Sequence, residues 1–406
     1  MEKQTPLTIP AHFLGDKKKQ AACSTTEEAY ALIAAQYASP LLAGPPLGPE
    51  LLELVRHMFN EEEVALVQYI PIPLGCMAGE LAVRGGHSLT ETLRILDGLA
   101  EEKGVLFCMG SGATRRYCLL PLVPGTFELV LMRVDQGGLT DWHSEFVRLF
   151  RRVFENGYFG EYVCRPVPVL TYVPVHQALD GHSAALPSDY LGELLDRYTV
   201  FGVSLCQCRL AARLEGGGCD KPLETCVTFG ALAELLIRRG KLRRISKREA
   251  LQIKADAERA GLVSFVAAAN LQPDLGGLSS GTSCSCCSDC CYPMKLIRSL
   301  DQPRIAAPPH FRPFWNAHRC VQCGQCATAC PVGALQFVVG EGVRYQAERC
   351  IGCGLCSVAC RVHHAVQMRP VENFRPAPQG VLQVLAKCLP NYARNVWRIE
   401  QNRRRS

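Results

Sequence analysis

The sequence lacks the motifs by which most cofactor-dependent enzymes are recognised. It contains no P-loop, no G-x-G-x-x-G after a strand-like segment, no C-x3-C-x2-C triad of the radical-initiating type and no compact nucleophile motif. Hydride transfer and group transfer therefore have no visible support in the chain.

Signals for export and for membrane spanning are also missing. Residues 1–19 carry charges, including a run of three lysines, and have no apolar core, so they do not form a secretory signal. Residues 29–49 are uncharged, but four prolines would break a spanning helix. We therefore expect a cytoplasmic protein without a transmembrane segment.

Cysteine is the residue in excess, with 23 among 406 residues. The rest of the composition, 48% hydrophobic and 20% charged, is ordinary for a globular protein of two or three domains. The cysteines cluster in C-x-C, C-C and C-x2-C units, which suit metal ligation better than disulfide bonds. The compartment should therefore be reducing.

Eight cysteines between residues 320 and 360 form two runs of identical C-x2-C-x2-C-x3-C spacing. In such a duplication three thiolates of one run and the last thiolate of the other bind one iron–sulfur cluster. Cluster I is predicted on Cys320, Cys323, Cys326 and Cys360, and cluster II on Cys350, Cys353, Cys356 and Cys330. Two zinc knuckles are the alternative, but a four-ligand zinc site has no need of this doubled spacing.

Residues 316–362 resemble a bacterial two-cluster ferredoxin module, with Cys330-Pro331, Ala334-Leu335 and the turn at 351–354 as further points of similarity. The resemblance implies two 4Fe–4S clusters and one-electron transfer. Arg361 stands where such repeats usually place proline. Its positive charge beside Cys360 predicts an altered potential for cluster I.

A second group of nine cysteines precedes this module. Cys206 and Cys208 are expected on a turn after a strand, and Cys226 is expected in the first turn of a helix that Leu223 opens. A loop should carry the last five cysteines. The candidate ligands are Cys206, Cys208, Cys219, Cys226, Cys284, Cys286, Cys287, Cys290 and Cys291.

Nine thiols exceed the four that one cubane needs. One or two further iron–sulfur clusters, one cluster with a redox-active thiol pair, or a site with an open coordination position would all account for them, and a single all-cysteine zinc site is the alternative. The layout resembles a group of iron–sulfur proteins from anaerobes that begin with a winged helix and end in a two-cluster ferredoxin module. The matching residues are Cys206, Cys208, Arg209, Cys219, Pro222, Cys226, Phe229 and Gly230.

Residues 50–123 alternate helical and strand-like periods in the order of a winged helix, with strands at 105–109 and 116–122. The presumed recognition helix after Ser88 is net acidic, so sequence-specific DNA binding is not expected. It would have to use Arg84, Arg115 and Arg116. A helix from Thr140 to about Phe159 is amphipathic and basic, which favours docking on its own protein but allows membrane contact.

The sequence predicts an α+β protein with five segments. These are an N-terminal region with a winged-helix-like module (1–125), an amphipathic helix and linker (126–184), a cysteine-rich α/β middle domain (185–302), a two-cluster ferredoxin-like domain (314–365) and an extension with a basic tail (366–406). A proline-rich connector spans 303–313. Six isolated cysteines are expected to be buried or incidental: Cys23, Cys76, Cys108, Cys118, Cys164 and Cys388.

The predicted function is that of an iron–sulfur electron-transfer protein or redox subunit, with a redox protein as partner and no nucleic acid. An iron–sulfur reductase with its catalytic cluster in the middle domain and a redox-sensing winged-helix regulator are the alternatives.

Overall fold

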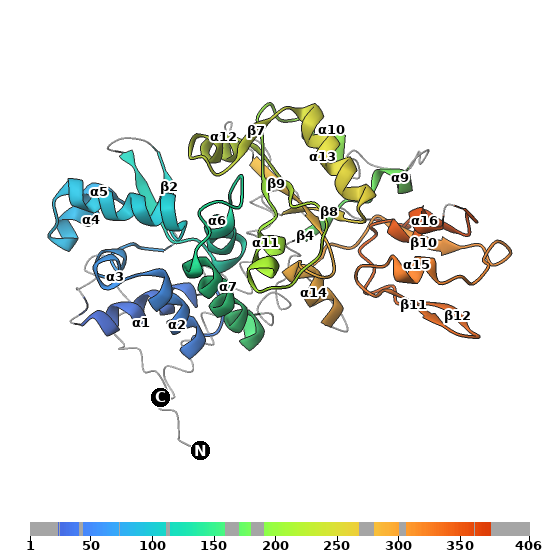
Figure 1. Cartoon of the computed structure of the whole chain (residues 1–406), viewed down its shortest axis with the longest axis horizontal. Coiled ribbons are helices and arrows are strands. Elements are labelled where there is room, and N and C mark those ends of the chain that lie inside the picture. Colours follow the sequence, from blue (N-terminus) through green and yellow to red (C-terminus); the bar gives the residue numbers. More distant parts are fainter. Residues whose placement is uncertain are drawn as a thin grey trace, which may run out of the picture. The chain divides into compact units, whose positions relative to one another are not determined.

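The computed structural model describes residues 23, 25–39, 44–72, 74–110, 114–158, 170–179, 191–267, 280–299, 306–360 and 362–374. The protein is a mixed helix-and-strand (α+β) chain that forms two compact units (Figure 1). The first comprises Met1–Leu131 and Gly138–Tyr162, and the second Met132–Gly137 and Val163–Ser406. Arg361, Cys164, Cys388 and the arginine-rich tail lie outside the described residues.

The first unit combines helices with one small sheet. Its elements are α1 Thr26–Tyr37, α2 Pro49–Met58, α3 Glu61–Val67, β1 Cys76–Met77, α4 Ala78–Gly85, α5 Leu89–Asp97, β2 Phe107–Met109, β3 Arg116–Cys118, α6 Phe127–Leu131 and α7 Asp141–Val153. The sheet is antiparallel with the order β1-β3-β2. Strands β2 and β3 lie within the predicted strand segments 105–109 and 116–122, and α5 begins after Ser88 as predicted. Elements α1, β1 and α6 were not predicted, and the winged-helix interpretation stays a prediction.

Capping explains where two of these helices begin. The Asn60 side chain accepts the Glu63 N–H at 2.8 Å while the Glu63 carboxylate accepts the Asn60 N–H, so the two form a reciprocal capping box for α3. Ser88 accepts the Glu91 N–H at the start of α5.

The amphipathic helix α7 buries its apolar face within its own unit. Phe146 and Phe150 are fully buried, and the Phe150 ring stacks on Phe127 with centroids 4.5 Å apart. On its polar side, Arg148 pairs with Glu145. Among the described residues no helix is long and apolar enough to cross a membrane.

The second unit is built on a six-stranded antiparallel sheet with the order β4-β8-β9-β6-β5-β7. The strands are β4 Leu170–Tyr172, β5 Phe201–Leu205, β6 Glu224–Gly230, β7 Arg243–Ile245, β8 Val263–Ala267 and β9 Ser280–Cys286. The edge position of β4 agrees with the strand or linker predicted for that proline-interrupted segment.

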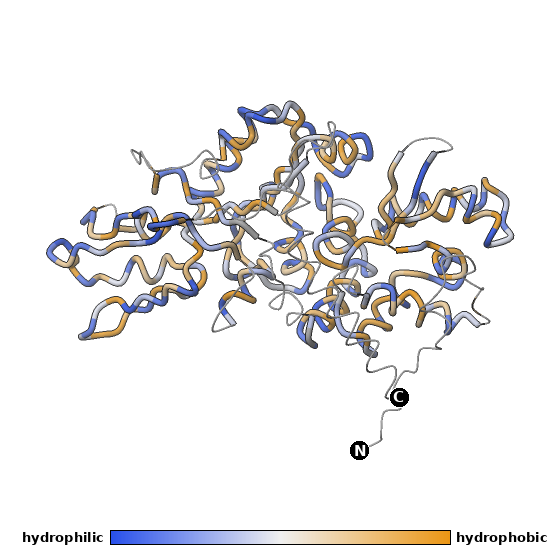
Figure 2. The backbone as a smooth tube through the Cα atoms, turned by 180° about the vertical axis from the view of Figure 1, so that it is seen from behind, coloured by the Kyte–Doolittle hydropathy of each residue, from blue (hydrophilic) through white to orange (hydrophobic). Residues whose placement is uncertain are grey.

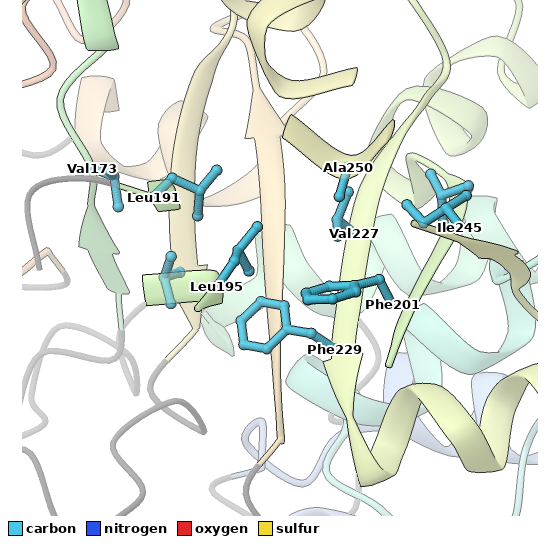
Figure 3. Close-up of a cluster of buried hydrophobic side chains, with 10 residues drawn as sticks. Val173, Leu191, Leu195, Phe201, Val227, Phe229, Ile245 and Ala250 are labelled. Atoms are coloured by element: carbon cyan, nitrogen blue, oxygen red, sulfur yellow. The ribbon is translucent and has the colours of Figure 1, made fainter. Parts of the chain in front are cut away.

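One face of this sheet carries the hydrophobic core. Val203, Val227, Phe229 and Val266 contribute to it from the strands, and Figure 3 shows several of these side chains gathered over the sheet. The helices that pack against the sheet are α10 Leu191–Leu195, α12 Ala231–Arg238 and α13 Lys247–Arg259. The tube of α13 alternates between hydrophobic and hydrophilic residues, as a helix with one buried face requires (Figure 2).

Two local predictions in this unit were wrong. Cys226 lies in the middle of strand β6, and the helix begins only at Ala231, because the β-branched and aromatic residues of 225–229 favour a strand. Cys284 and Cys286 lie on strand β9, although a loop was predicted. Cys208 lies in the first turn of α11 Gln207–Leu214, which Cys206 caps.

The C-terminal part of the second unit is a small ferredoxin-like domain. Its strands β10 Phe311–Trp315 and β13 Val366–Pro370 pair antiparallel, β11 Leu335–Val338 and β12 Gly342–Tyr345 form a hairpin, and α15 Gln325–Thr328 and α16 Leu355–Ala359 follow the cysteine loops. The predicted connector ends before Pro313, because Phe311–Pro313 already pair with β13. Preceding elements of the unit are α9 His176–Leu179 and α14 Tyr292–Ser299.

Candidate iron–sulfur site

The ferredoxin-like domain brings its eight cysteines together in two separate cavities. One cavity is lined by Cys320, Cys323, Cys326 and Cys360. A second is lined by Cys330, Cys350, Cys353 and Cys356. Each cavity thus collects the four thiols that the crosswise pattern assigns to one cluster. Cys323 is exposed, whereas Cys353 and Cys356 are buried.

The backbone of both cysteine loops turns through left-handed conformations. Gly324 and Gly354 cap α15 and α16 with φ of 72° and 80°. Gly352 has a φ of 68°, and Gln322, at the same place in the first run, has a φ of 54°. These turns let one short loop direct three thiols to a common centre, and glycine adopts them without steric cost.

Polar groups beside the cavities fit an anionic cluster. The Trp315 Nε1–H and the Tyr345 hydroxyl are buried and find no nitrogen or oxygen acceptor among the described residues. Burial raises the pKa of Cys326 and of Cys350, while nearby Trp315 and Tyr345 respectively oppose that rise. These donors therefore point at sulfur, where they would stabilise a thiolate or a cluster.

Arg312 is a further residue of this site that sequence reasoning missed. Its Nε is buried without a partner among the described residues. The pKa of Cys350 is raised by burial, and the positive charge of Arg312 opposes that rise. Arg312 lies on β10, before the first cysteine run, so the cysteine spacing gave no sign of it.

The middle cysteines lie largely on the sheet face opposite the hydrophobic core. Side chains alternate along a strand, so Cys226 faces away from Val227, and Cys284 faces away from Ser283 and Ser285. Across the sheet, Cys284 is the partner of Phe265, which in turn is the partner of Tyr172. Cysteine thiols and the Tyr172 ring therefore share one face.

Six of the nine middle thiols interact in two neighbouring groups. Cys226 contacts Cys206 and Cys284, and Cys291 contacts Cys208 and Cys286. The pKa of Cys206 is raised by its contact with Cys226 and by burial, and burial raises that of Cys286 to about 12. Raised pKa values at Cys206 and Cys286 favour the neutral thiol, and a bound metal cation would favour the thiolate.

The other three thiols, Cys219, Cys287 and Cys290, form a group of their own. Their sulfur atoms all lie within 4.8 Å of one another. The pKa of Cys287 is lowered, whereas burial raises that of Cys290 to about 12. Burial alone would also raise the pKa of Cys287, but the Cys290 N–H and the charge of Arg209 outweigh that effect.

Two buried cations accompany the middle thiols. Arg209 is fully buried on α11 and donates to the carbonyls of Pro222 and Ser285. Lys254 is 2% exposed on α13, and its Nζ donates to the Ser283 carbonyl at 2.6 Å and to the Ser285 hydroxyl at 3.0 Å. Burial lowers the pKa of Lys254, and negative charge on Cys226, Cys284, Cys286 and Cys206 opposes that shift. Buried cations are retained where an anion balances them, which fits metal-bound thiolates.

Tyr172 connects the two parts of the site. Its hydroxyl is buried and has no hydrogen-bond partner among the described residues. Its pKa is raised first by burial and then by charge on Cys291, Cys286, Cys353 and Cys284. Tyr172 is therefore close to the middle thiols and to a cluster II cysteine at the same time.

Comparison with known proteins identifies one part of the chain. Residues 314–368 match the family model of the 4Fe-4S dicluster domain, so this segment is a ferredoxin-like domain. The match spans both cysteine runs and supports iron–sulfur clusters and an electron-transfer role. Searches of curated proteins and of solved structures found no match.

Proposed function

We propose that this protein is an electron-transfer protein or redox subunit that passes single electrons between two ferredoxin-type 4Fe–4S clusters and a further cluster on the middle thiols. The observation that carries the proposal is the position of Tyr172. Its hydroxyl interacts electrostatically with Cys353 of the ferredoxin-like domain and with three of the middle thiols, Cys284, Cys286 and Cys291. Because the buried Tyr172 side chain is close to thiols of both sites, the two sites lie near each other, as electron tunnelling between them requires.

The backbone after Tyr172 supplies a second connection. The Val175 N–H donates to the Cys353 carbonyl at 2.9 Å, and Val173 N–H donates to Ser264 of the middle sheet at 3.0 Å. The space beside Gly354 is filled by Ala178, because a Cβ on Gly354 would lie 2.3 Å from the Ala178 Cβ. Cluster II is thereby fixed to the strand that borders the middle thiols.

Cluster I is the proposed entry point for electrons from a partner protein. Its ligand Cys323 is exposed, and so are Val321 (58%) and Val362 (78%) on the flanking segments. Exposed apolar residues around an accessible ligand mark a site where a redox partner can dock. Electrons would then pass from cluster I to cluster II and on to the middle site, in a reducing cytoplasmic compartment of an anaerobic cell.

The DNA-binding regulator has less support. Arg84, Arg115 and Arg116 would have to contact phosphates, yet Arg115 pairs with Asp97 and Arg116 donates to the carbonyls of Leu74 and Gly75. Arg84 donates to the Tyr69 carbonyl. We propose that the winged-helix-like region serves in packing or docking.

The reductase alternative requires a catalytic cluster in the middle domain with a position for substrate. No contact among the described residues favours it over electron transfer.

Electron paramagnetic resonance of the fully reduced protein tests the proposed route. Two neighbouring reduced clusters split each other's signals, so the wild-type spectrum should contain an interaction between cluster II and the middle cluster. Cys356→Ser, which disrupts cluster II, should simplify the middle-cluster signal. Cys323→Ser, which disrupts cluster I, is the matched control and should leave the interaction intact. A middle-cluster signal that is the same in all three proteins would refute the route.

A further inference from the structure

The three thiols of Cys219, Cys287 and Cys290 are spaced for one metal ion. The Sγ atom of Cys219 lies 3.6 Å from that of Cys287 and 3.7 Å from that of Cys290. Zinc binds thiolates tetrahedrally at about 2.3 Å, which sets sulfur–sulfur distances of about 3.8 Å. The observed separations therefore match three corners of one tetrahedron.

The same separations do not suit an iron–sulfur cubane. In a cubane each thiolate binds a different iron, so the ligating sulfurs lie farther apart than sulfurs that share one ion. The ferredoxin-like domain provides an internal comparison, because all eight of its cluster cysteines are among the described residues. No three of them bring their sulfur atoms within 4.8 Å of one another, as Cys219, Cys287 and Cys290 do.

The local backbone has the form of a metal-binding knuckle. Cys287 and Cys290 enclose a turn of two residues, Ser288 and Asp289, and the Cys290 N–H donates to the Cys287 sulfur. Cys219 approaches from the loop after α11, and its N–H donates to the Cys290 sulfur. Backbone donors of this kind stabilise metal-bound thiolates and fix their direction.

The three thiols are accessible to solvent on the side of Cys219 and lie beside the positive charge of Arg209. Cys219 is half-buried, and its neighbours Gly218 and Asp220 are exposed. A divalent ion with three thiolates has a net charge of −1. Arg209 is fully buried beside Cys219 and Cys287, and its Nε makes no hydrogen bond to the described residues. Its single positive charge would balance the complex.

We propose that Cys219, Cys287 and Cys290 hold one zinc ion, separate from the iron–sulfur clusters, with a fourth coordination position open to solvent. Zinc has no redox chemistry of its own, so the ion acts as a Lewis acid beside the electron-transfer centres. A centre with three thiolates is soft, and the ligand class that fits its open position is a small thiol in its thiolate form.

Metal analysis and zinc-edge X-ray absorption of the full, anaerobically purified chain test this proposal. Absorption at the zinc edge is blind to iron, so the clusters do not interfere. We expect about one zinc per chain with three sulfur neighbours at about 2.3 Å and one oxygen neighbour. Added 2-mercaptoethanol should convert the shell to four sulfurs.

The variant Cys219→Ser should lose the zinc and keep the wild-type iron content, which also shows that the chain has folded. Ser288→Ala, on the same turn, is the matched control and should keep both metals. Wild-type protein without zinc, a zinc shell of four sulfurs before thiol is added, or loss of iron together with zinc in Cys219→Ser would each overturn the proposal. The first and second of these outcomes need no variant.

Discussion

Replacing Lys254 with methionine removes a buried cation that interacts with the middle thiols across the sheet and nearly preserves side-chain length. The Lys254 Nζ donates to the Ser283 carbonyl and to the Ser285 hydroxyl. Leaving a buried acceptor without its donor costs about 1–3 kcal/mol. Removing one member of a buried charge pair costs about 3–5 kcal/mol, because the other charge is left uncompensated.

The size of the effect should depend on whether metal is bound. In the metal-free chain the pKa of Cys226 is raised, so its thiol is neutral, and loss of Lys254 also removes the cost of burying its charge. In the loaded chain the thiolates and their cluster are anionic, and the charge-pair cost applies. Lys254→Met should therefore destabilise the loaded protein by about 3–5 kcal/mol and the metal-free protein by about 1 kcal/mol or less.

Anaerobic thermal unfolding of the loaded and the chelator-stripped proteins measures this difference. A unit of this size loses about 2–4 °C per kcal/mol, so Tm of the loaded variant should fall by about 6–20 °C. Gln252→Met, on the exposed side of the same helix, is the control and should change Tm little in either form. Equal losses of Tm in the loaded and stripped forms of Lys254→Met would refute the reasoning.

Three further predictions concern other parts of the chain. Arg312→Gln should make the potential of cluster II more negative by about 30–90 mV in a redox titration, because a positive charge that favours the reduced state is lost, whereas Arg344→Gln on the exposed hairpin should not. Gly354→Ala should lower the iron content through loss of cluster II, because its Cβ would meet Ala178, whereas Gly340→Ala, with the same positive φ and open space, should keep it. Burial raises the pKa of Glu128 from 4.5 to about 7. This carboxyl therefore contributes stability below about pH 4.5 that is lost as the pH rises through 7. Glu128→Gln should remove that part of the pH dependence of Tm in thermal unfolding, and an unchanged dependence would contradict the assignment.

The ferredoxin-like domain could be predicted from sequence because its ligands are local. Three thiols of each cluster come from one seven-residue loop, and spacing alone defines them. The family match at 314–368 agrees with that prediction. The start of α5 could be predicted for the same reason, since its cap Ser88 acts on the three residues that follow it.

The middle site could not be predicted to the same depth, because sheet pairing assembles it from distant segments. Cys226 was assigned to the first turn of a helix that Leu223 opens, whereas Cys226 lies in a strand of β-branched and aromatic residues that pairs with β5 and β9. Tyr172 joins the site only because β4 pairs with β8. In the sequence Lys254 belongs to a helix rich in charged residues, so nothing marks it as buried. Only the packing of α13 on the sheet shows its burial.

Quantitation of iron and acid-labile sulfide in the anaerobically purified full-length protein tests the central claim most directly. Two cubanes on the eight ferredoxin cysteines require at least about eight irons and eight sulfides per chain, with more if the middle thiols hold a further cluster. A coloured protein with that content, which bleaches on reduction by dithionite, is the predicted result. A colourless protein with fewer than about eight irons, or with zinc in place of iron at these cysteines, would contradict the account.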